Sequence, residues 1–134
     1  MKWLGAVLVS LCMIAGTANA GTYRCVVHDF NGFDRDDKLF IERNRQKTFE
    51  LTIGPQTVVL SMFSDHFQNY TRTYGGFDVG FSSIVAKDPD GTGLDTIIVP
   101  KNPKARLARS GYFDAMIINA GTFYSNNWHL HCQE

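Results

Sequence analysis

The closing residues of the chain, 126–134, read NNWHLHCQE and decide how the fold is closed. Apolar and histidine positions alternate here: Trp128, Leu130 and Cys132 against His129 and His131. Side chains on a β-strand point alternately to the two faces of the sheet, so this period-two pattern is typical of a strand with one buried face. We therefore expect a final strand whose leucine and cysteine face the core and whose histidines face away from it.

Residues 1–20, MKWLGAVLVSLCMIAGTANA, have the pattern of a secretory signal peptide. A lysine precedes an apolar run at 3–14, and an Ala-x-Ala cleavage motif follows at 18–20. The run is shorter than the roughly 20 apolar residues of a transmembrane helix. A bulky leucine before the cysteine in this run does not suit lipoprotein processing. We expect a periplasmic or secreted protein without a membrane anchor, consisting of one domain at residues 21–134.

Two cysteines remain after removal of the signal peptide, Cys25 and Cys132. An even number of cysteines in an oxidising compartment predicts a disulfide, and with two the pairing is unambiguous. The alternative is a pair of free thiols. A bridge that closes so long a loop should stabilise the fold by about 4–5 kcal/mol on the chain-entropy model. It would also bring the first and last strands together.

A direct cross-strand bridge would fix the register of these two strands, with Val27 opposite Leu130 and His28 opposite His129. On that register His28, His129 and His131 all lie on the outer face, because residues i and i+2 of a strand share a face. Cross-strand Cβ atoms are about 5 Å apart, so three imidazoles could converge on Zn²⁺ or Cu²⁺. The alternative is three solvent-facing histidines and no cofactor.

The middle of the chain is rich in strand-like segments. Residues 48–53, TFELTI, alternate cleanly, with Phe49, Leu51 and Ile53 on one face. Further β-rich segments are 38–43, 57–63, 76–85 and 95–99, and turn signals fall at 31–32, 54–55, 75–76 and 88–91. Short strands at this spacing predict an all-β domain, either a small antiparallel barrel or a sandwich.

One segment near the C-terminus departs from the β pattern. In residues 102–111, NPKARLARSG, Asn102 suits an N-cap, Pro103 a first helical residue and Gly111 a C-terminal stop. Good helix formers lie between them. The pattern is compatible with a two-turn helix at 103–110 or with a short strand.

The charge balance and the catalytic motifs that the sequence lacks argue against some classes of function. The full chain carries 13 Lys+Arg and 13 Asp+Glu, which is not the basic footprint of a nucleic-acid-binding protein. The nucleophile elbow G-x-S-x-G and the zinc-protease motif H-E-x-x-H do not occur in the sequence. We therefore expect neither a nucleic-acid partner nor an enzyme.

Two groups of residues are candidates for contact with a protein or small-ligand partner. Tyr70 and Tyr74 lie in an aromatic-rich stretch, and exposed tyrosines are typical of recognition surfaces. The alternative is that they fill the core. Lys101, Lys104 and Arg106 form a basic cluster that could dock an anionic partner or simply be solvated, and Ser110 follows it.

The two ends of the mature chain resemble one known family. TYRC at 22–25 and HCQE at 131–134 are similar to the ends of bacterial periplasmic inhibitors of c-type lysozyme. The resemblance, which covers the ends, the size and the export signal, implies an eight-stranded antiparallel barrel with its first and last strands bridged. In that family a loop with a serine and a downstream Lys-Gly enters the lysozyme cleft. Ser110-Gly111-Tyr112 resembles the first part, whereas a Lys-Gly dipeptide does not occur in this sequence.

Residues and resemblance together predict an antiparallel barrel of about eight strands, closed by the terminal disulfide. The leading functional hypothesis is a non-enzymatic periplasmic or secreted binding module. The alternatives are an inhibitor of a lysozyme-like cell-wall hydrolase and a histidine-based metal-binding protein. An inhibitor would expose Ser110, a ligand-binding barrel would have an aromatic-lined mouth, and a metal-binding protein would bring His28, His129 and His131 together.

The disulfide is directly testable on the mature chain. Cys25→Ala or Cys132→Ala should lower the free energy of unfolding by about 2–5 kcal/mol, because the unfolded chain regains conformational freedom. Thiol titration of denatured, unreduced protein should detect no free thiol. Two thiols per mature chain would contradict the bridge.

Overall fold

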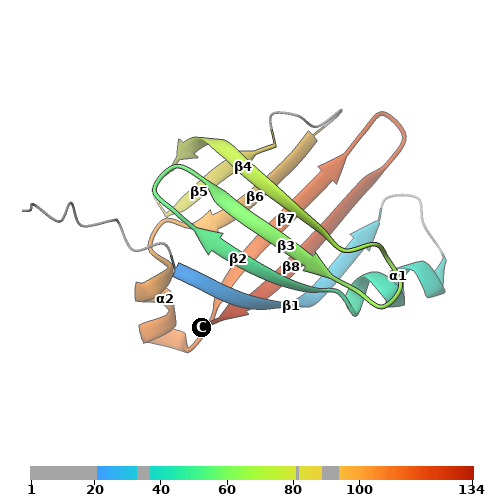
Figure 1. Cartoon of the computed structure of the whole chain (residues 1–134), viewed down its shortest axis with the longest axis horizontal. Helices are drawn as coiled ribbons and strands as arrows, with labels where there is room; N and C mark the ends of the chain where they lie inside the picture. The colour runs from blue at the N-terminus through green and yellow to red at the C-terminus, as the bar shows by residue number, and fades with distance from the viewer. Residues whose placement is uncertain (1–20, 33–36, 81, 89–93) are drawn as a thin grey trace, which may run out of the picture.

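The computed structural model describes residues 21–32, 37–80, 82–88 and 94–134, so the predicted signal peptide and most of the turn at 88–91 lie outside the described residues. The strands are β1 (Gly21–Gly32), β2 (Thr48–Ile53), β3 (Val58–Phe63), β4 (Tyr70–Val79), β5 (Ser83–Lys87), β6 (Leu94–Pro100), β7 (Phe113–Ala120) and β8 (Ser125–Gln133). Two helices, α1 (Lys38–Arg45) and α2 (Pro103–Ser110), complete the elements. Each strand pairs antiparallel with the next, and β8 pairs with β1, so the sheet closes (Figure 1). The predicted eight-stranded antiparallel barrel is confirmed.

The terminal disulfide lies where the first and last strands meet. Cys25 and Cys132 are bonded and directly opposite each other, with a Cα–Cα distance of 4.0 Å, and Val27 is opposite Leu130 as predicted. Leu130 is fully buried. The bridge and the inward leucine confirm the predicted inner face of β8.

The predicted pairing of His28 with His129 is wrong, because β1 contains a bulge. The register shifts between Val27 and Asp29, and Asp29 rather than His28 lies opposite His129. A bulge places two residues of one strand against one of its partner. Its consequence here is that Phe30 turns inward opposite Trp128, with ring centroids 5.2 Å apart. An uninterrupted ladder would have placed the Asp29 carboxylate on that inner face.

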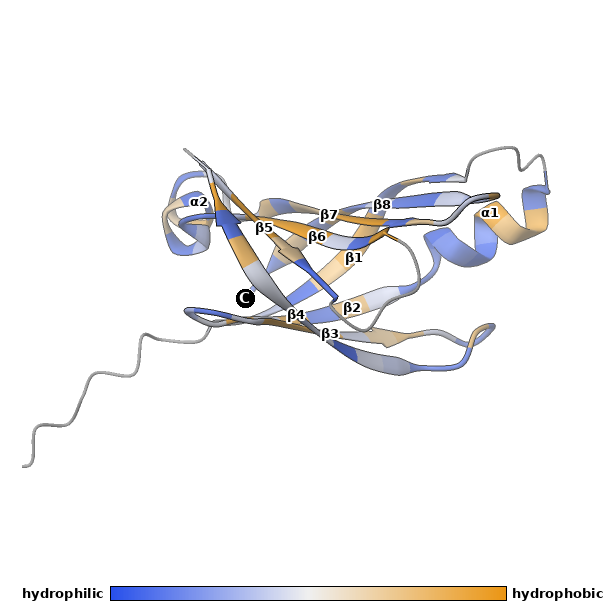
Figure 2. Ribbon diagram, turned by 90° about the horizontal axis from the view of Figure 1, so that it is seen from above, coloured by the Kyte–Doolittle hydropathy of each residue, from blue (hydrophilic) through white to orange (hydrophobic). Residues whose placement is uncertain are grey.

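The core fills the barrel interior from every strand. Phe49, Leu51 and Ile53 of β2 are buried, as their alternation predicts. Tyr23 of β1 packs edge-to-face on Phe113 of β7, with ring centroids 4.9 Å apart. Hydrophobic residues recur along β6 and β7 (Figure 2). Among the described residues, no helix has the length and apolar character needed to cross a bilayer.

The segment that was compatible with helix or strand is the helix α2. Asn102 caps its start by accepting a hydrogen bond from the Ala105 N–H, and a proline occupies the first turn. Gly111 ends the helix at φ 79°, and its N–H donates to the Leu107 carbonyl. This left-handed C-cap is one that glycine adopts without steric cost.

Two local expectations are corrected by the structure. The β-rich segment 38–43 lies in the helix α1, because Asp37 caps that helix by accepting hydrogen bonds from the Leu39 and Phe40 N–H groups. Phe40 then packs on Phe30 of β1, with ring centroids 5.9 Å apart. The turn expected at 75–76 lies inside β4, where the register against β5 shifts and Gly76 has φ 61°.

A polar network lies against the inner side of β4 and β6. Asp95 is 5% exposed, accepts a hydrogen bond from the Tyr74 hydroxyl at 2.9 Å and forms an ion pair with Arg72. The Arg72 guanidinium lies 4.6 Å from the ring centroid of Tyr70. Burial, reinforced by the Asp95 charge, raises the pKa of Tyr74. Tyr74 is fully buried, so it fills the interior and is not part of a surface for partners, whereas Tyr70 is half-buried and packs against the core.

Lys47 is a buried cation in the same region. Its side chain is 7% exposed, and its Nζ lies 4.4 Å from the Phe67 ring centroid and 4.8 Å from that of Trp128. Aromatic faces attract a cation and partly offset its loss of water. Burial, together with the charge of Arg72, lowers the pKa of Lys47 to about 8.

We expect the stability of the wild type to rise with pH above 8 relative to that of Lys47→Met. The folded protein releases the Lys47 proton near pH 8, whereas the unfolded chain holds it to about 10.4. The unfolded state therefore binds more protons in this window, so the free energy of unfolding increases with pH. Below pH 8 the buried Lys47 charge lowers the free energy of unfolding by its full amount. Deprotonation toward pH 10 restores up to about 3 kcal/mol of that free energy.

Urea unfolding of both proteins between pH 7 and pH 10 measures this difference. The exposed Lys104 of α2 provides the matched control, because Lys104→Met should differ from the wild type by a constant amount. A constant difference for Lys47→Met as well would contradict the lowered pKa.

Candidate functional site

The candidate site lies on the outer wall of the barrel, where β7 and β8 pair. Alternation along β8 buries Trp128, Leu130 and Cys132 and leaves His129 and His131 half-buried on the outer face. The register of β7 places Asp114 directly opposite His131. Asp114 is exposed, because its neighbours Phe113 and Ala115 point into the core.

Asp114, His129 and His131 form what we call the wall cluster. The Asp114 Oδ1 lies 3.0 Å from the His131 Nε2 and 3.4 Å from the His129 Nε2. One ligand atom from each residue lies within 4.8 Å of the others. Among the described residues, this is the one group of at least three histidine, cysteine or carboxylate side chains whose ligand atoms lie close enough together to hold a metal ion.

The three predicted histidines do come together, although the bulge changes their arrangement. His28 stacks on His131 with ring centroids 4.0 Å apart and an interplanar angle of 7°, and it meets His129 edge-on at 5.4 Å. Tyr112 also stacks on His131, at 4.7 Å. The close group of ligand atoms contains Asp114 in place of His28. His28 therefore contacts the cluster through its ring and is not a member of it.

Asp114 is the residue that sequence reasoning missed. The strand assignment from sequence omitted residues 113–120. The final strand was therefore expected to pair with the first strand, and its partner on the other side was not identified. The signal was nevertheless present: FDAMI alternates, with Phe113, Ala115 and Ile117 buried in the structure. Recognising that strand would have placed Asp114 and Met116 outward beside the histidines.

The wall cluster fits a tetrahedral metal ion after a small adjustment. Zinc binds imidazole nitrogen and carboxylate oxygen at about 2.0–2.2 Å, which places neighbouring ligand atoms about 3.3–3.5 Å apart. The two distances from Asp114, 3.0 and 3.4 Å, are close to that spacing. The widest separation, up to 4.8 Å, has to shorten by rotation of the side chains. Three protein ligands would leave at least one position for water or another group.

Surface grooves border the cluster. A groove of about 400 Å³ includes Asp114, Met116 and His129 in its lining, and one of about 720 Å³ includes His131 and Arg24. Tyr112 lines both. A ligand or partner could therefore approach the cluster from either groove.

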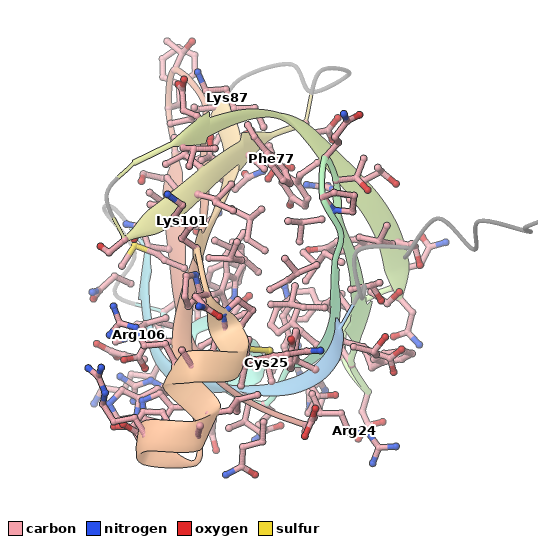
Figure 3. All side chains as sticks on the ribbon, turned by 90° about the vertical axis from the view of Figure 1, so that its left-hand side faces the viewer. Arg24, Cys25, Phe77, Lys87, Lys101 and Arg106 are labelled. Atoms are coloured by element: carbon pink, nitrogen blue, oxygen red, sulfur yellow. A yellow bond between two sulfur atoms is a disulfide. The ribbon has the colours of Figure 1, made fainter. Side chains whose placement is uncertain are left out.

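The other predicted partner-binding residues lie on or next to α2 and are exposed: Lys101, Lys104, Arg106 and Ser110. Figure 3 looks onto the end of the barrel that carries α2 and labels two of them, Lys101 and Arg106. Arg106 and Ser110 line the smaller groove together with His129, whereas Lys101 and Lys104 line a different hollow. Ser110 is the last residue of α2, so it lies at a helix end rather than on a long loop.

Comparison with protein-family models, with curated proteins and with solved structures finds no match to this chain.

Proposed function

We propose that this protein is a non-enzymatic, exported metal-binding module that holds a divalent transition-metal ion on the outside of its barrel. The observation that carries the proposal is the wall cluster, where Asp114, His129 and His131 bring ligand atoms within 4.8 Å of one another. Imidazole and carboxylate are ligands that zinc and copper accept. The export of the protein is part of the proposal and follows from the signal-peptide pattern.

The backbone supports the proposal because it holds the ligands in place before any metal binds. His129 and His131 lie on β8, which is hydrogen-bonded to β1 on one side and to β7 on the other. Cys132, next to His131, is covalently tied to β1. Metal sites on rigid elements need less reorganisation than sites on loops. Stacking on His28 and Tyr112 further restricts the His131 ring.

Calorimetric titration of the mature protein with Zn²⁺ should detect one site. His129→Ala, His131→Ala and Asp114→Asn should each weaken binding at least about tenfold, since each removes one of three ligands. Zn²⁺ should also raise the Tm of the wild type, because it binds the folded state.

His66→Ala is the matched control. His66 is exposed and hydrogen-bonds Gln46 at 3.1 Å, and it is not a member of the wall cluster. Unchanged Zn²⁺ affinity in this variant is expected. Absence of binding to the wild type, or equal loss in His66→Ala, would overturn the proposal.

A second candidate function is inhibition of a lysozyme-like hydrolase. The observation that favours it is that Ser110 and Arg106, both exposed, share one groove. Addition of the mature protein should then lower the rate at which a c-type lysozyme clears bacterial cell walls, and Ser110→Trp should restore that rate. An unchanged rate with excess protein would rule this function out for the enzyme tested.

A further inference from the structure

Met116 lies beside the wall cluster on the same outer face. It is two residues from Asp114 along β7, so the two side chains share a face, and it is directly opposite His129 on β8. Directly opposite residues have Cβ atoms about 5 Å apart. The four side chains thus form two adjacent cross-strand pairs, Asp114 with His131 and Met116 with His129.

The Met116 side chain is available to a ligand. It is 37% exposed, whereas Ala115 and Ile117 on either side are buried in the core. Met116 and His129 both line the 400 Å³ groove and also a second hollow of about 240 Å³. A methionine side chain is unbranched and flexible, so its sulfur can move toward a metal ion that the neighbouring imidazole holds.

The chemistry of the thioether distinguishes among metals. Zinc sites in proteins use thiolate, imidazole and carboxylate ligands. Thioethers are soft ligands that suit Cu(I), and blue-copper sites combine two histidines and a cysteine with a weakly bound methionine. Two imidazoles, a carboxylate and a thioether provide ligands for both Cu(II) and Cu(I).

We infer that the wall cluster is a copper site and that Met116 supplies a thioether ligand to the bound ion. The inference rests on the proposed metal-binding function and adds the identity of the metal and a fourth side chain. His129, His131 and Met116 bind Cu(I), while Asp114 contributes mainly to Cu(II), because a carboxylate is a hard ligand.

Competition with a chromogenic Cu(I) chelator, without oxygen and with ascorbate present, measures the Cu(I) affinity of the mature protein. Met116→Leu keeps an apolar side chain of similar size and removes the sulfur. It should weaken Cu(I) binding at least about tenfold and change Zn²⁺ binding by less than about twofold, since zinc does not use the thioether. His129→Ala should weaken both. Val26→Leu, an exposed apolar position opposite His131, should change neither.

Methyl NMR provides a direct test of ligation. The mature chain contains two methionines, Met62 and Met116, and Met62 is 1% exposed in the core. One equivalent of Cu(I) should shift the Met116 ε-methyl signal and leave that of Met62 in place. Equal Cu(I) affinity of wild type and Met116→Leu, or an unshifted Met116 methyl, overturns the copper inference. If Zn²⁺ still binds through the wall cluster, the proposed metal-binding function stands although the copper inference fails. If neither metal binds, the proposed function and the copper inference both fail.

Discussion

The structure depends on the closure of β1 against β8. The pairing turns a sheet that would have two open edges into a barrel with none, and open edges are where strands of different chains associate. The Cys25–Cys132 bond makes this pairing covalent at one point. Around that point the register is fixed, so the inner side of β8 can carry Leu130 and Trp128 while its outer side carries polar groups.

The bulge in β1 shows how closure and core packing are reconciled. Near the disulfide the two strands pair residue for residue, but further along β1 the sequence offers Asp29 where the core needs an apolar side chain. One extra residue moves Phe30 into that place, where it contacts Trp128 and Phe40. The same extra residue sets the position of His28, whose ring stacks on His131 rather than facing His129 across the ladder. A packing requirement inside the barrel therefore arranges the aromatic rings outside it.

Sequence patterns predicted the fold well where one local signal was sufficient. The alternation of β2 identified Phe49, Leu51 and Ile53 as core residues, and the cap, proline and glycine of 102–111 matched a helix. The interpretation of residues 38–43 as β-rich was wrong. Their aromatic and β-branched residues are typical of a strand, but the Asp37 cap and the packing on β1 stabilise a helix. Propensity was overridden there by tertiary contact.

The candidate site was only half predictable because it joins separate segments. His129 and His131 share a strand, so alternation places both outward. Asp114 joins them through the pairing of β7 with β8, which no single segment reveals. The bulge was equally hidden, because it follows from the fit of Phe30 to Trp128 across two strands that are distant in sequence. Contacts across strands, rather than patterns along one strand, account for what was missed.

The position of the wall cluster on the outside of a closed barrel has a kinetic consequence. The interior is filled by side chains such as Leu51, Leu60 and Leu130, all fully buried, so the barrel has little freedom to open or close around a ligand. An ion bound at the wall cluster would instead lie on the outer wall, next to two grooves and within reach of another molecule's donor atoms. Such an ion would pass to or from a partner by direct exchange of ligands, with the barrel itself unchanged.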